Sequence, residues 1–500
     1  MMTGLMSVLA GRMAKGLAPA LALAIFDRGR IVQRGLLGSV DGRGKPPRVD
    51  TAFRIASCTK SFTAAAVLLL RERGLLALDD DVARYVPGLR VFGPGGDARH
   101  DFRPSIRHLL TMSAGLPTDD PWADRQESLS NGAFGSLLAA GIRLVRAPGT
   151  GYEYSNLGYA LLGQVIEAAS GHAYVDFIRT ELLEPLGLSA TGFDSTVPAP
   201  GGVAAGCRRD GTTWERLPFS SPGAFSAIGG LFSTLVDLGR WAAWLADGFG
   251  TTEEADIAPL SRPVRREMQQ IHCRIPSEPG HPEGRVTGYG YGLVVHNDPR
   301  GVVVGHAGGY PGFSAYMRWH PATGAAVVGF ENASYSGVGN LVRDVLDHVL
   351  DGAPASTKPE PRLDRHAEPP AEAPPEGRAA PMTAWPELLA ARSVVERLVR
   401  NWDDALARSI FADNVELDTS LAQRRERLGA ELAVCGPVLP LEGTAGSSAT
   451  AAQLAWTMPA VRGGLNCFIS LSPLHNPRVQ SLDFAAVADV ASFRQAAAAS

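Results

Sequence analysis

A proline-rich stretch near the end of the chain limits what its 500 residues can fold into. Residues 352–383 contain eight prolines among many alanines and glutamates. Proline removes a backbone donor and breaks helices and central strands, so this segment cannot form a packed core. We therefore predict a linker over residues 352–384, a large domain over residues 1–351 and a small α+β domain over residues 385–500.

The spacing of apolar residues predicts both helices and strands in the large domain. A hairpin is expected at residues 21–38, where two apolar runs flank an Asp-Arg-Gly turn. From residue 289 onward the period becomes that of strands. The expected strands are 289–295, 302–306, 314–319 and 325–330, and the expected helices are 4–18, 57–73, 75–87, 105–112, 157–170, 173–183 and 338–350. Residues 113–136 are rich in Asp, Pro and Gly and are expected to form a long loop, which in a compact domain is often functional.

Composition argues against several classes of function. The net charge is −4 and no long basic tract occurs, which argues against nucleic acid as a partner. Five cysteines are scattered without a C-x-x-C, so we expect neither a disulfide framework nor a metal site, and Cys58 is expected to be a small packing residue. No run is long enough to span a membrane. Residues 16–26 have the length of a signal peptide but also form a strand of the hairpin, so we expect a retained N-terminus and a cytoplasmic protein.

Ser57 and Lys60 stand out as candidate catalytic residues. They are three positions apart at the start of an apolar helical run, so their side chains share one helix face. The chain has only four lysines and otherwise uses arginine, which keeps its proton near neutral pH, whereas burial lowers the pKa of a lysine. The pair therefore indicates a nucleophile with an adjacent base. The alternative is a lysine whose stem covers apolar surface.

Two further short patterns accompany this pair. Tyr154-Ser155-Asn156 is the only Y-x-N of the chain, and it lies in a turn before a helix. His306-Ala307-Gly308 is the only H-x-G, and it lies at the end of a strand. Ser57 likewise heads the only S-x-x-K. Each pattern alone is weak, and each residue has a structural alternative, such as a helix N-cap for Asn156. Three single occurrences in this order are a much stronger indication.

In this order the patterns resemble the signature of the serine β-lactamase and penicillin-binding protein superfamily, which is S-x-x-K, then S-x-N or Y-x-N, then K-T-G or H-x-G. The Y-x-N form is similar to the class C β-lactamase, D-aminopeptidase and esterase branch. The resemblance covers about residues 15–350. It implies an α+β fold of the β-lactamase/DD-peptidase type, with an antiparallel sheet flanked by helices and a helical subdomain. His306 stands where many β-lactamases have a lysine, which weakens the case for β-lactam carboxylate recognition.

The resemblance also implies a role for each motif residue, in a reaction that needs no cofactor and no metal. Ser57 would attack a carbonyl and form an acyl-enzyme, while Lys60 takes its proton. Tyr154 would return the proton to the leaving group, provided that nearby cations lower its pKa. The N–H groups of Ser57 and Gly309 would form an oxyanion hole. The other implied site residues are His306, which would orient substrate or polarise the site, and the substrate-binding residues Asn156, Gly308 and Gly309.

The expected function is a serine hydrolase acting on an ester or amide of a small molecule or a D-residue peptide. One alternative is a penicillin-binding-type thioesterase or transacylase that cyclises peptides, with a carrier protein delivering the acyl chain. Another is a catalytically silent binding module that keeps the fold. Water and an amine both stay open as acceptors.

The C-terminal segment carries none of the three patterns. Helices are expected at residues 385–412 and 420–435, and strands at 448–458, 464–472 and 478–486. Its strands are apolar enough to pack on a neighbour. We expect an accessory domain that docks on the catalytic domain and limits access to Ser57, with a separately tumbling domain as the alternative.

Overall fold

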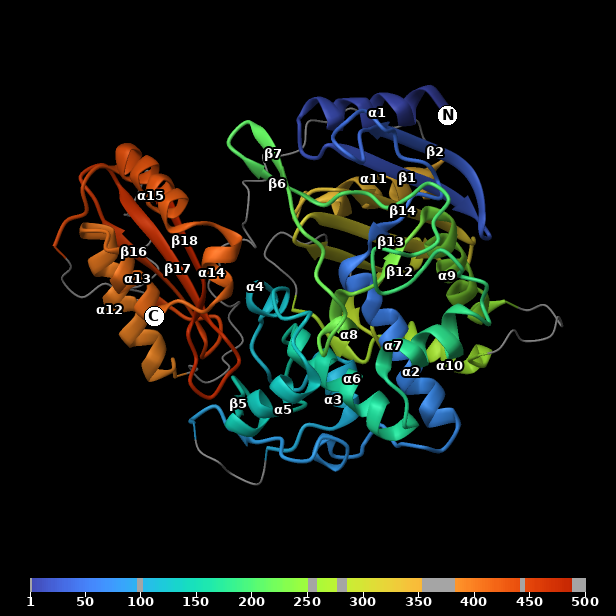
Figure 1. Cartoon of the computed structure of the whole chain (residues 1–500), viewed down its shortest axis with the longest axis horizontal. Coiled ribbons are helices and arrows are strands. Elements are labelled where there is room, and N and C mark those ends of the chain that lie inside the picture. The colour runs from blue at the N-terminus through green and yellow to red at the C-terminus, as the bar shows by residue number, and fades with distance from the viewer. Residues whose placement is uncertain are drawn as a thin grey trace.

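The computed structural model describes residues 2–96, 102–250, 259–276, 286–352, 383–440 and 446–487. These residues form a larger body and a smaller one beside it, which is drawn in orange and red in Figure 1. Most of the predicted linker lies outside the described residues. Among the helices that the structure describes, none combines the length and apolar character that a membrane crossing requires.

An eight-stranded antiparallel sheet forms the centre of the larger body. Its strand order is β2-β1-β14-β13-β12-β11-β10-β9, so the N-terminal hairpin joins strands from much later in the chain. The bounds are β1 Ala20–Asp27, β2 Arg30–Gly38, β9 Cys273–Arg274, β10 Val286–Tyr289, β11 Val294–Asp298, β12 Gly301–Tyr310, β13 Phe313–His320 and β14 Ala325–Glu331. The predicted hairpin and the antiparallel sheet are confirmed.

Strand β1 shows why both faces of the sheet are covered. Successive side chains of a strand point to opposite faces. Leu21 and Leu23 pack with α1 (Met2–Ala14) and α11 (Val338–Asp351) on one face. The alanines between them face the main core, on the side of α9 (Leu235–Ala246). The strand is buried on both faces, and its sequence is accordingly almost continuously apolar, as expected for a central strand.

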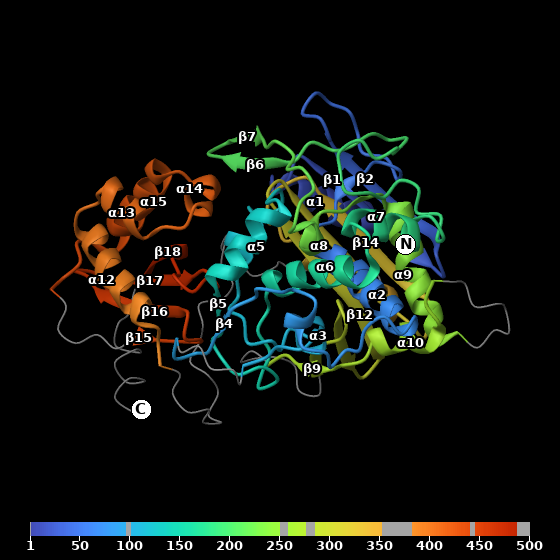
Figure 2. The same cartoon turned by 60° about the horizontal axis from the view of Figure 1, so that its bottom comes forward.

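Helix α2 (Thr59–Glu72) runs through the centre of the larger body and is buried from Thr59 to Leu70. A helix that is apolar on all sides is a core helix. It packs against α6 (Asn156–Ser170), and Phe62 stacks on Trp241 of α9 with 3.8 Å between ring centroids. Figure 2 shows the helical side of this body. Its other helices are α3 Ile106–Leu110, α4 Asp120–Ala123, α5 Asn131–Ala140, α7 Tyr174–Ile178, α8 Ser226–Gly229 and α10 Arg262–Met268.

Short paired strands complete the larger body. They are β3 Phe53–Arg54 with β8 Phe232–Ser233, β4 Val91–Phe92 with β5 Ile142–Arg143, and β6 Cys207–Asp210 with β7 Thr213–Arg216.

Four predicted elements differ from the structure. The loop expected at 113–136 contains α4 and the start of α5, and the helix expected at 385–412 is divided between Arg400 and Asp404. The strand expected at 289–295 is divided by a turn at Gly292, where φ is +70° and an added Cβ would lie 2.5 Å from the Lys60 carbonyl oxygen. The helix expected at 75–87 contains only a 3₁₀ turn at Val82–Arg84. Here the side chains of Asp80 and Asp81 accept hydrogen bonds from nearby backbone N–H groups, which competes with helix formation.

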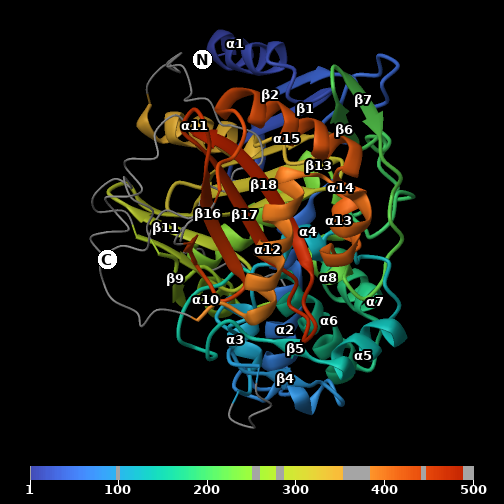
Figure 3. The ribbon, with the colours of Figure 1, turned by 90° about the vertical axis from the view of Figure 1, so that its left-hand side faces the viewer.

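The smaller body is a four-stranded antiparallel sheet with four helices, as seen face-on in Figure 3. It has its own apolar core, to which Val145 of the larger body is added. A backbone hydrogen bond of 2.9 Å joins Arg143 N to the Pro473 oxygen, and His475 stacks on Phe92. The bounds are α12 Pro386–Arg400, α13 Asp404–Ile410, α14 Asn414–Asp418, α15 Leu421–Cys435, β15 Gly446–Ser447, β16 Gln453–Pro459, β17 Gly464–Leu471 and β18 Val479–Val487.

Candidate active site

Ser57 lies in a 3₁₀ turn, Ala56–Cys58, that leads into α2. Its side chain is only 9% exposed. Ala56 adopts φ +47°, a left-handed conformation that is strained for alanine and that accompanies functional sites. Strand β12 passes directly beside this turn. A Cβ added to Gly308 would lie 2.4 Å from the Ile55 oxygen and 3.1 Å from the Ser57 nitrogen, which is too close for a side chain. The sequence therefore needs a glycine at this position.

The ammonium group of Lys60 is fully buried and is surrounded by oxygen atoms. Its Nζ lies 2.9 Å from Ser57 Oγ, 2.5 Å from Asn156 Oδ1 and 2.9 Å from the Ile228 carbonyl oxygen. Burial lowers the pKa of Lys60 to about 8, although the carboxylates of residues 119, 120 and 124 oppose this shift. A substantial fraction of this lysine is therefore neutral in mildly basic solution.

The three partners determine where the lone pair of neutral Lys60 points. A carbonyl oxygen only accepts hydrogen bonds, so Asn156 Oδ1 and the Ile228 oxygen both take N–H groups of the amine. The two N–H groups of a neutral amine are then used, and its lone pair faces the Ser57 hydroxyl. This geometry suits transfer of the serine proton to the lysine.

Tyr154 is placed at the same nucleophile. The Ser57 side chain is among the groups that influence its hydroxyl, and Lys60 Nζ lies 5.1 Å from its ring centroid. Burial and the neighbouring Asp120 raise the pKa of Tyr154 well above its ordinary value. The condition stated for its role, a pKa lowered by nearby cations, is therefore not met, and Tyr154 is a neutral phenol that is able to donate a proton.

His306 lies next to Tyr154, with 6.2 Å between ring centroids. Its Nδ1 is 2.5 Å from the Ala307 carbonyl oxygen, which only accepts, so Nδ1 carries the proton. Nε2 is then the acceptor for the Tyr289 hydroxyl at 3.0 Å. Burial, followed by the charge of Lys60, lowers the pKa of His306 to about 3. His306 is thus neutral near pH 7, and both of its ring nitrogens are engaged by the protein.

An acidic segment that the motifs did not include supports Asn156. The amide nitrogen of Asn156 donates to the Asp120 carboxylate, while its amide oxygen accepts from Lys60. Asp119 accepts from the backbone nitrogens of Asn156 at 2.7 Å and of Leu157 at 2.9 Å, at the start of α6. Burial raises the pKa of Asp119 to about 7. The sequence feature that could have indicated these carboxylates is the Asp-Asp-Pro-Trp-Ala-Asp run within the expected loop.

Two neighbours of Asn156 complete this support. Helix α6 begins at Asn156 itself, and Ser155 is the N-cap, so the N-cap alternative for Asn156 is wrong. Met112 adopts φ +56°, and its sulfur accepts from the Ser155 nitrogen at 3.4 Å. Its carbonyl oxygen accepts from the Glu153 nitrogen at 2.8 Å. Met112 therefore holds the segment that carries Tyr154.

Cys58 and Gly309 also lie at the site. The Cys58 thiol is buried and donates to the His306 carbonyl oxygen at 3.1 Å, and burial raises its pKa to about 12. An unreactive packing residue fits these facts. A Cβ on Gly309 would lie 2.6 Å from the ring of Tyr335, whose hydroxyl donates to Asp124 at 2.5 Å.

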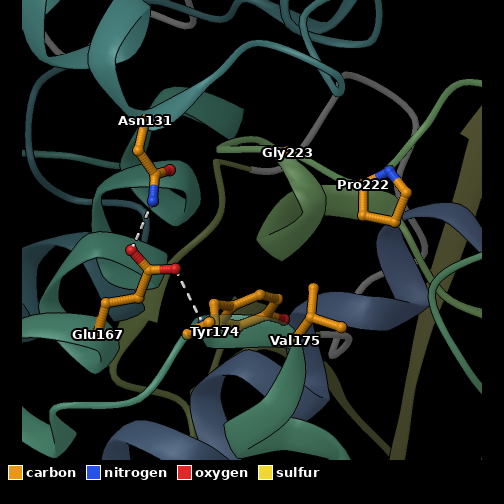
Figure 4. A pocket seen from close by; sticks show the side chains of 7 residues that line it. Asn131, Glu167, Tyr174, Val175, Pro222 and Gly223 are labelled. Atoms are coloured by element: carbon orange, nitrogen blue, oxygen red, sulfur yellow. Dashed lines mark hydrogen bonds between the residues drawn. The ribbon is translucent and has the colours of Figure 1, made fainter.

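The pocket in Figure 4 is a different feature. It is lined by residues of α5, α6, α7 and residues 222–223, and none of them belongs to the motif set. Glu167 in this pocket already accepts from Asn131 Nδ2 and the Tyr174 nitrogen, each at 2.9 Å. Within the described part of the chain, no group of three or more potential metal ligands is assembled.

Comparisons with known proteins identify a family and a fold. A family model described as Beta-lactamase matches residues 5–351. Penicillin-binding protein 4* of Bacillus subtilis is 27% identical over 289 residues, which cover 55% of this chain and 59% of that protein. The chain thus spans about three fifths of the length of that relative.

Solved structures show the same fold at low sequence identity. The octameric penicillin-binding protein homologue from Pyrococcus abyssi has a TM-score of 0.57 and 21% identity, over 96% of this chain and 99% of that one. A D-stereospecific amidohydrolase from Streptomyces sp. has a TM-score of 0.55 and 24% identity, over 69% and 98%. The expected fold class and the expected superfamily are confirmed.

Proposed function

The chain belongs to the Beta-lactamase family, and from this premise we propose that it is a serine hydrolase that works through an acyl-enzyme on Ser57. The observation that carries the proposal is the position of Lys60. Its partners orient the lone pair of the neutral amine toward Ser57 Oγ at 2.9 Å, and its pKa is near 8. A buried lysine of this kind has little structural value unless it exchanges a proton.

The proposed acylation step uses these groups in order. Ser57 Oγ attacks the carbonyl carbon of the substrate, and its proton passes to Lys60. The N–H groups of Ser57 and Gly309 receive the negative charge that forms on the carbonyl oxygen. The leaving group takes the proton that Lys60 received. The neutral Tyr154 hydroxyl relays it by giving up its own proton as it accepts the other, so this role does not require a lowered Tyr154 pKa. Water then attacks the acyl carbon and gives a proton to Lys60. The bond between that carbon and Ser57 Oγ breaks, Lys60 returns the proton to Oγ, and the acid is released.

We propose esters and amides of small molecules or D-residue peptides as the substrate class. Two observations support this choice. His306 is neutral, so it offers no positive charge to a substrate carboxylate, which disfavours β-lactams. A structural relative is described as a D-stereospecific amidohydrolase. We also propose a cytoplasmic location, which all five cysteines as free thiols support and cell fractionation tests.

Substitution of the nucleophile tests the proposal. Ser57→Ala is expected to abolish turnover of p-nitrophenyl esters and D-amino-acid amides and to prevent labelling by a fluorophosphonate, as detected by mass spectrometry. Ser136→Ala, which changes an exposed serine on α5, is the control and should leave both unchanged. Wild-type turnover by Ser57→Ala would contradict the assignment.

A second assay separates hydrolysis from acyl transfer. A peptidyl thioester is incubated with the enzyme, and linear acid is separated from cyclic peptide by chromatography. Linear acid alone supports the hydrolase. Cyclic product would instead establish the transacylase, with a carrier protein as the expected acyl donor.

A further inference from the structure

The smaller body contacts the acidic segment of the active site. Helix α4 packs against β18 and α14 of the smaller body, and Figures 1 and 3 show these elements next to one another. Helix α4 starts at Asp120, so it carries the carboxylate that holds Asn156. The structure therefore brings a distant part of the chain within two residues of the catalytic network.

A single buried side chain makes the central contact. Gln480 of β18 is 1% exposed. Its Oε1 accepts from the Trp122 nitrogen at 3.3 Å, and its Nε2 donates to the Thr118 oxygen at 2.8 Å. The same nitrogen donates to the Leu471 oxygen of its own sheet at 2.9 Å. One amide group thus holds both ends of residues 118–122 to the smaller body.

The local structure explains why this segment needs an outside partner. The first N–H groups of a helix lack intrahelical acceptors and are usually satisfied by the N-cap side chain. The N-cap of α4 is Asp119, and its carboxylate does not cap α4 but accepts from the start of α6 instead. Gln480 supplies the acceptor that Trp122 of α4 would otherwise lack.

Gln480 is itself firmly placed. Its backbone oxygen accepts from Asn414 Nδ2 at 2.9 Å, and Asn414 is fully buried. Near this point, Arg125 forms an ion pair of 2.7 Å with Asp418 of α14. The amide is therefore anchored to the smaller body at the place where that body touches α4.

We propose that Gln480 is a positioning residue of the active site, which fixes residues 118–122 so that Asp119 and Asp120 hold Asn156 against Lys60. The C-terminal body then completes the active site of the larger one. This inference rests on the proposed role of Lys60 as the base. Truncation after Leu350 removes Gln480 together with everything else in the body, so a single substitution is the sharper experiment.

The test uses the full-length chain with Gln480→Leu, which keeps the volume and removes the amide. Its matched control is Gln423→Leu, because Gln423 of α15 donates to Asp210 across the same boundary, away from residues 118–122. Gln423 also caps α15, so this control includes a general loss of stability. Rates are expressed per mole of folded protein, as measured by circular dichroism.

We expect Gln480→Leu to lower kcat/KM about 10- to 100-fold, mainly in kcat, and to slow Ser57 labelling equally. The rising limb of the pH–rate profile should also move. The carboxylates that raise the pKa of Lys60 are those of residues 119, 120 and 124, so their withdrawal lowers its apparent pKa below about 8. The other ionisable groups around Lys60 are Cys58, His306, Tyr154 and Tyr159. Gln423→Leu should change neither quantity.

Gln480→Glu provides a second readout. The Gln480 amide donates two N–H groups, one to the Thr118 oxygen and one to the Leu471 oxygen. A protonated carboxyl has a single donor and keeps only one of these bonds, whereas the carboxylate has no donor for the Thr118 oxygen. The ratio of its kcat/KM to the wild-type value should fall as pH rises. A Gln480→Leu enzyme with wild-type kcat/KM and apparent pKa, or one that loses activity only in proportion to its folded fraction, would overturn the inference. Wild-type turnover by Ser57→Ala would instead overturn the proposed function.

Discussion

The two walls of the active site are held by different parts of the molecule. The inner wall consists of the turn Ala56–Cys58, α2 and β12, and its central residues lie in the main core of the larger body. The acidic wall consists of residues 118–124, and the smaller body holds it through Gln480. The inner wall carries the proposed nucleophile and base, whereas the acidic wall orients the amide next to them. The proposed proton transfer therefore takes place on one wall, whereas the Asn156 amide next to it is positioned by the other.

Loss of the base on the inner wall should have the largest effect. Lys60→Arg keeps a positive charge, but a guanidinium does not release its proton near neutral pH. We expect kcat/KM to fall about 10³-fold or more, with ester hydrolysis and fluorophosphonate labelling as the measurements. Lys60 is fully buried, so the larger guanidinium could also disturb packing, and Lys60→Met serves as a second variant. Activity near wild type in both would show that Lys60 is not the base.

Close packing within the inner wall gives the next largest effect. In Gly308→Ala, the added methyl group would lie 2.4 Å from the backbone oxygen of Ile55, so the turn that carries Ser57 must shift. We expect kcat to fall about 100-fold. Gly135→Ala on α5 is the control, since a Cβ there meets nothing within 4 Å. Equal activity of the two variants would mean that β12 does not fix the nucleophile.

A charge change on the acidic wall should shift a pH profile. In the wild type, kcat/KM should rise with pH and level off above about 8, where Lys60 is neutral. Asp120 raises the pKa of Lys60, so Asp120→Asn should move the rising limb to lower pH by about 1 unit. His306, with a pKa near 3, should add no step between pH 5 and 8. A shift to higher pH in Asp120→Asn would contradict this electrostatic account.

The ion pair at the rim of the smaller body should matter least. Arg125 and Asp418 are partly exposed, with side-chain exposures of 19% and 27%. Pairs of this kind contribute less than about 1 kcal/mol. Arg125→Gln is therefore expected to change the stability by that amount and the rate by less than about 3-fold. A loss as large as that of Gln480→Leu would show that the ion pair, rather than the buried amide, positions the acidic wall.

The sequence determined the inner wall in good part. Ser57 and Lys60 are close in sequence, so helical spacing alone predicts that their side chains meet, and the three single-copy patterns indicate the fold. The N-terminal hairpin and the strands after residue 300 follow from short apolar runs that are separated by turn residues. The turn at Gly292 was not predicted from the sequence, because it is required by a close contact with α2, which lies more than two hundred residues earlier in the chain.

Only the tertiary structure decided the acidic wall and the protonation states. The carboxylates of residues 119 and 120 lie in a segment that reads as a polar loop, and residues 118 and 122 on either side are hydrogen-bonded to a domain that begins after residue 380. The neutral state of His306 and the raised pKa of Tyr154 follow from burial and from charges brought in by distant segments. A sequence pattern records local spacing, whereas pKa values depend on every charge and dipole within several ångströms, whatever its distance along the chain.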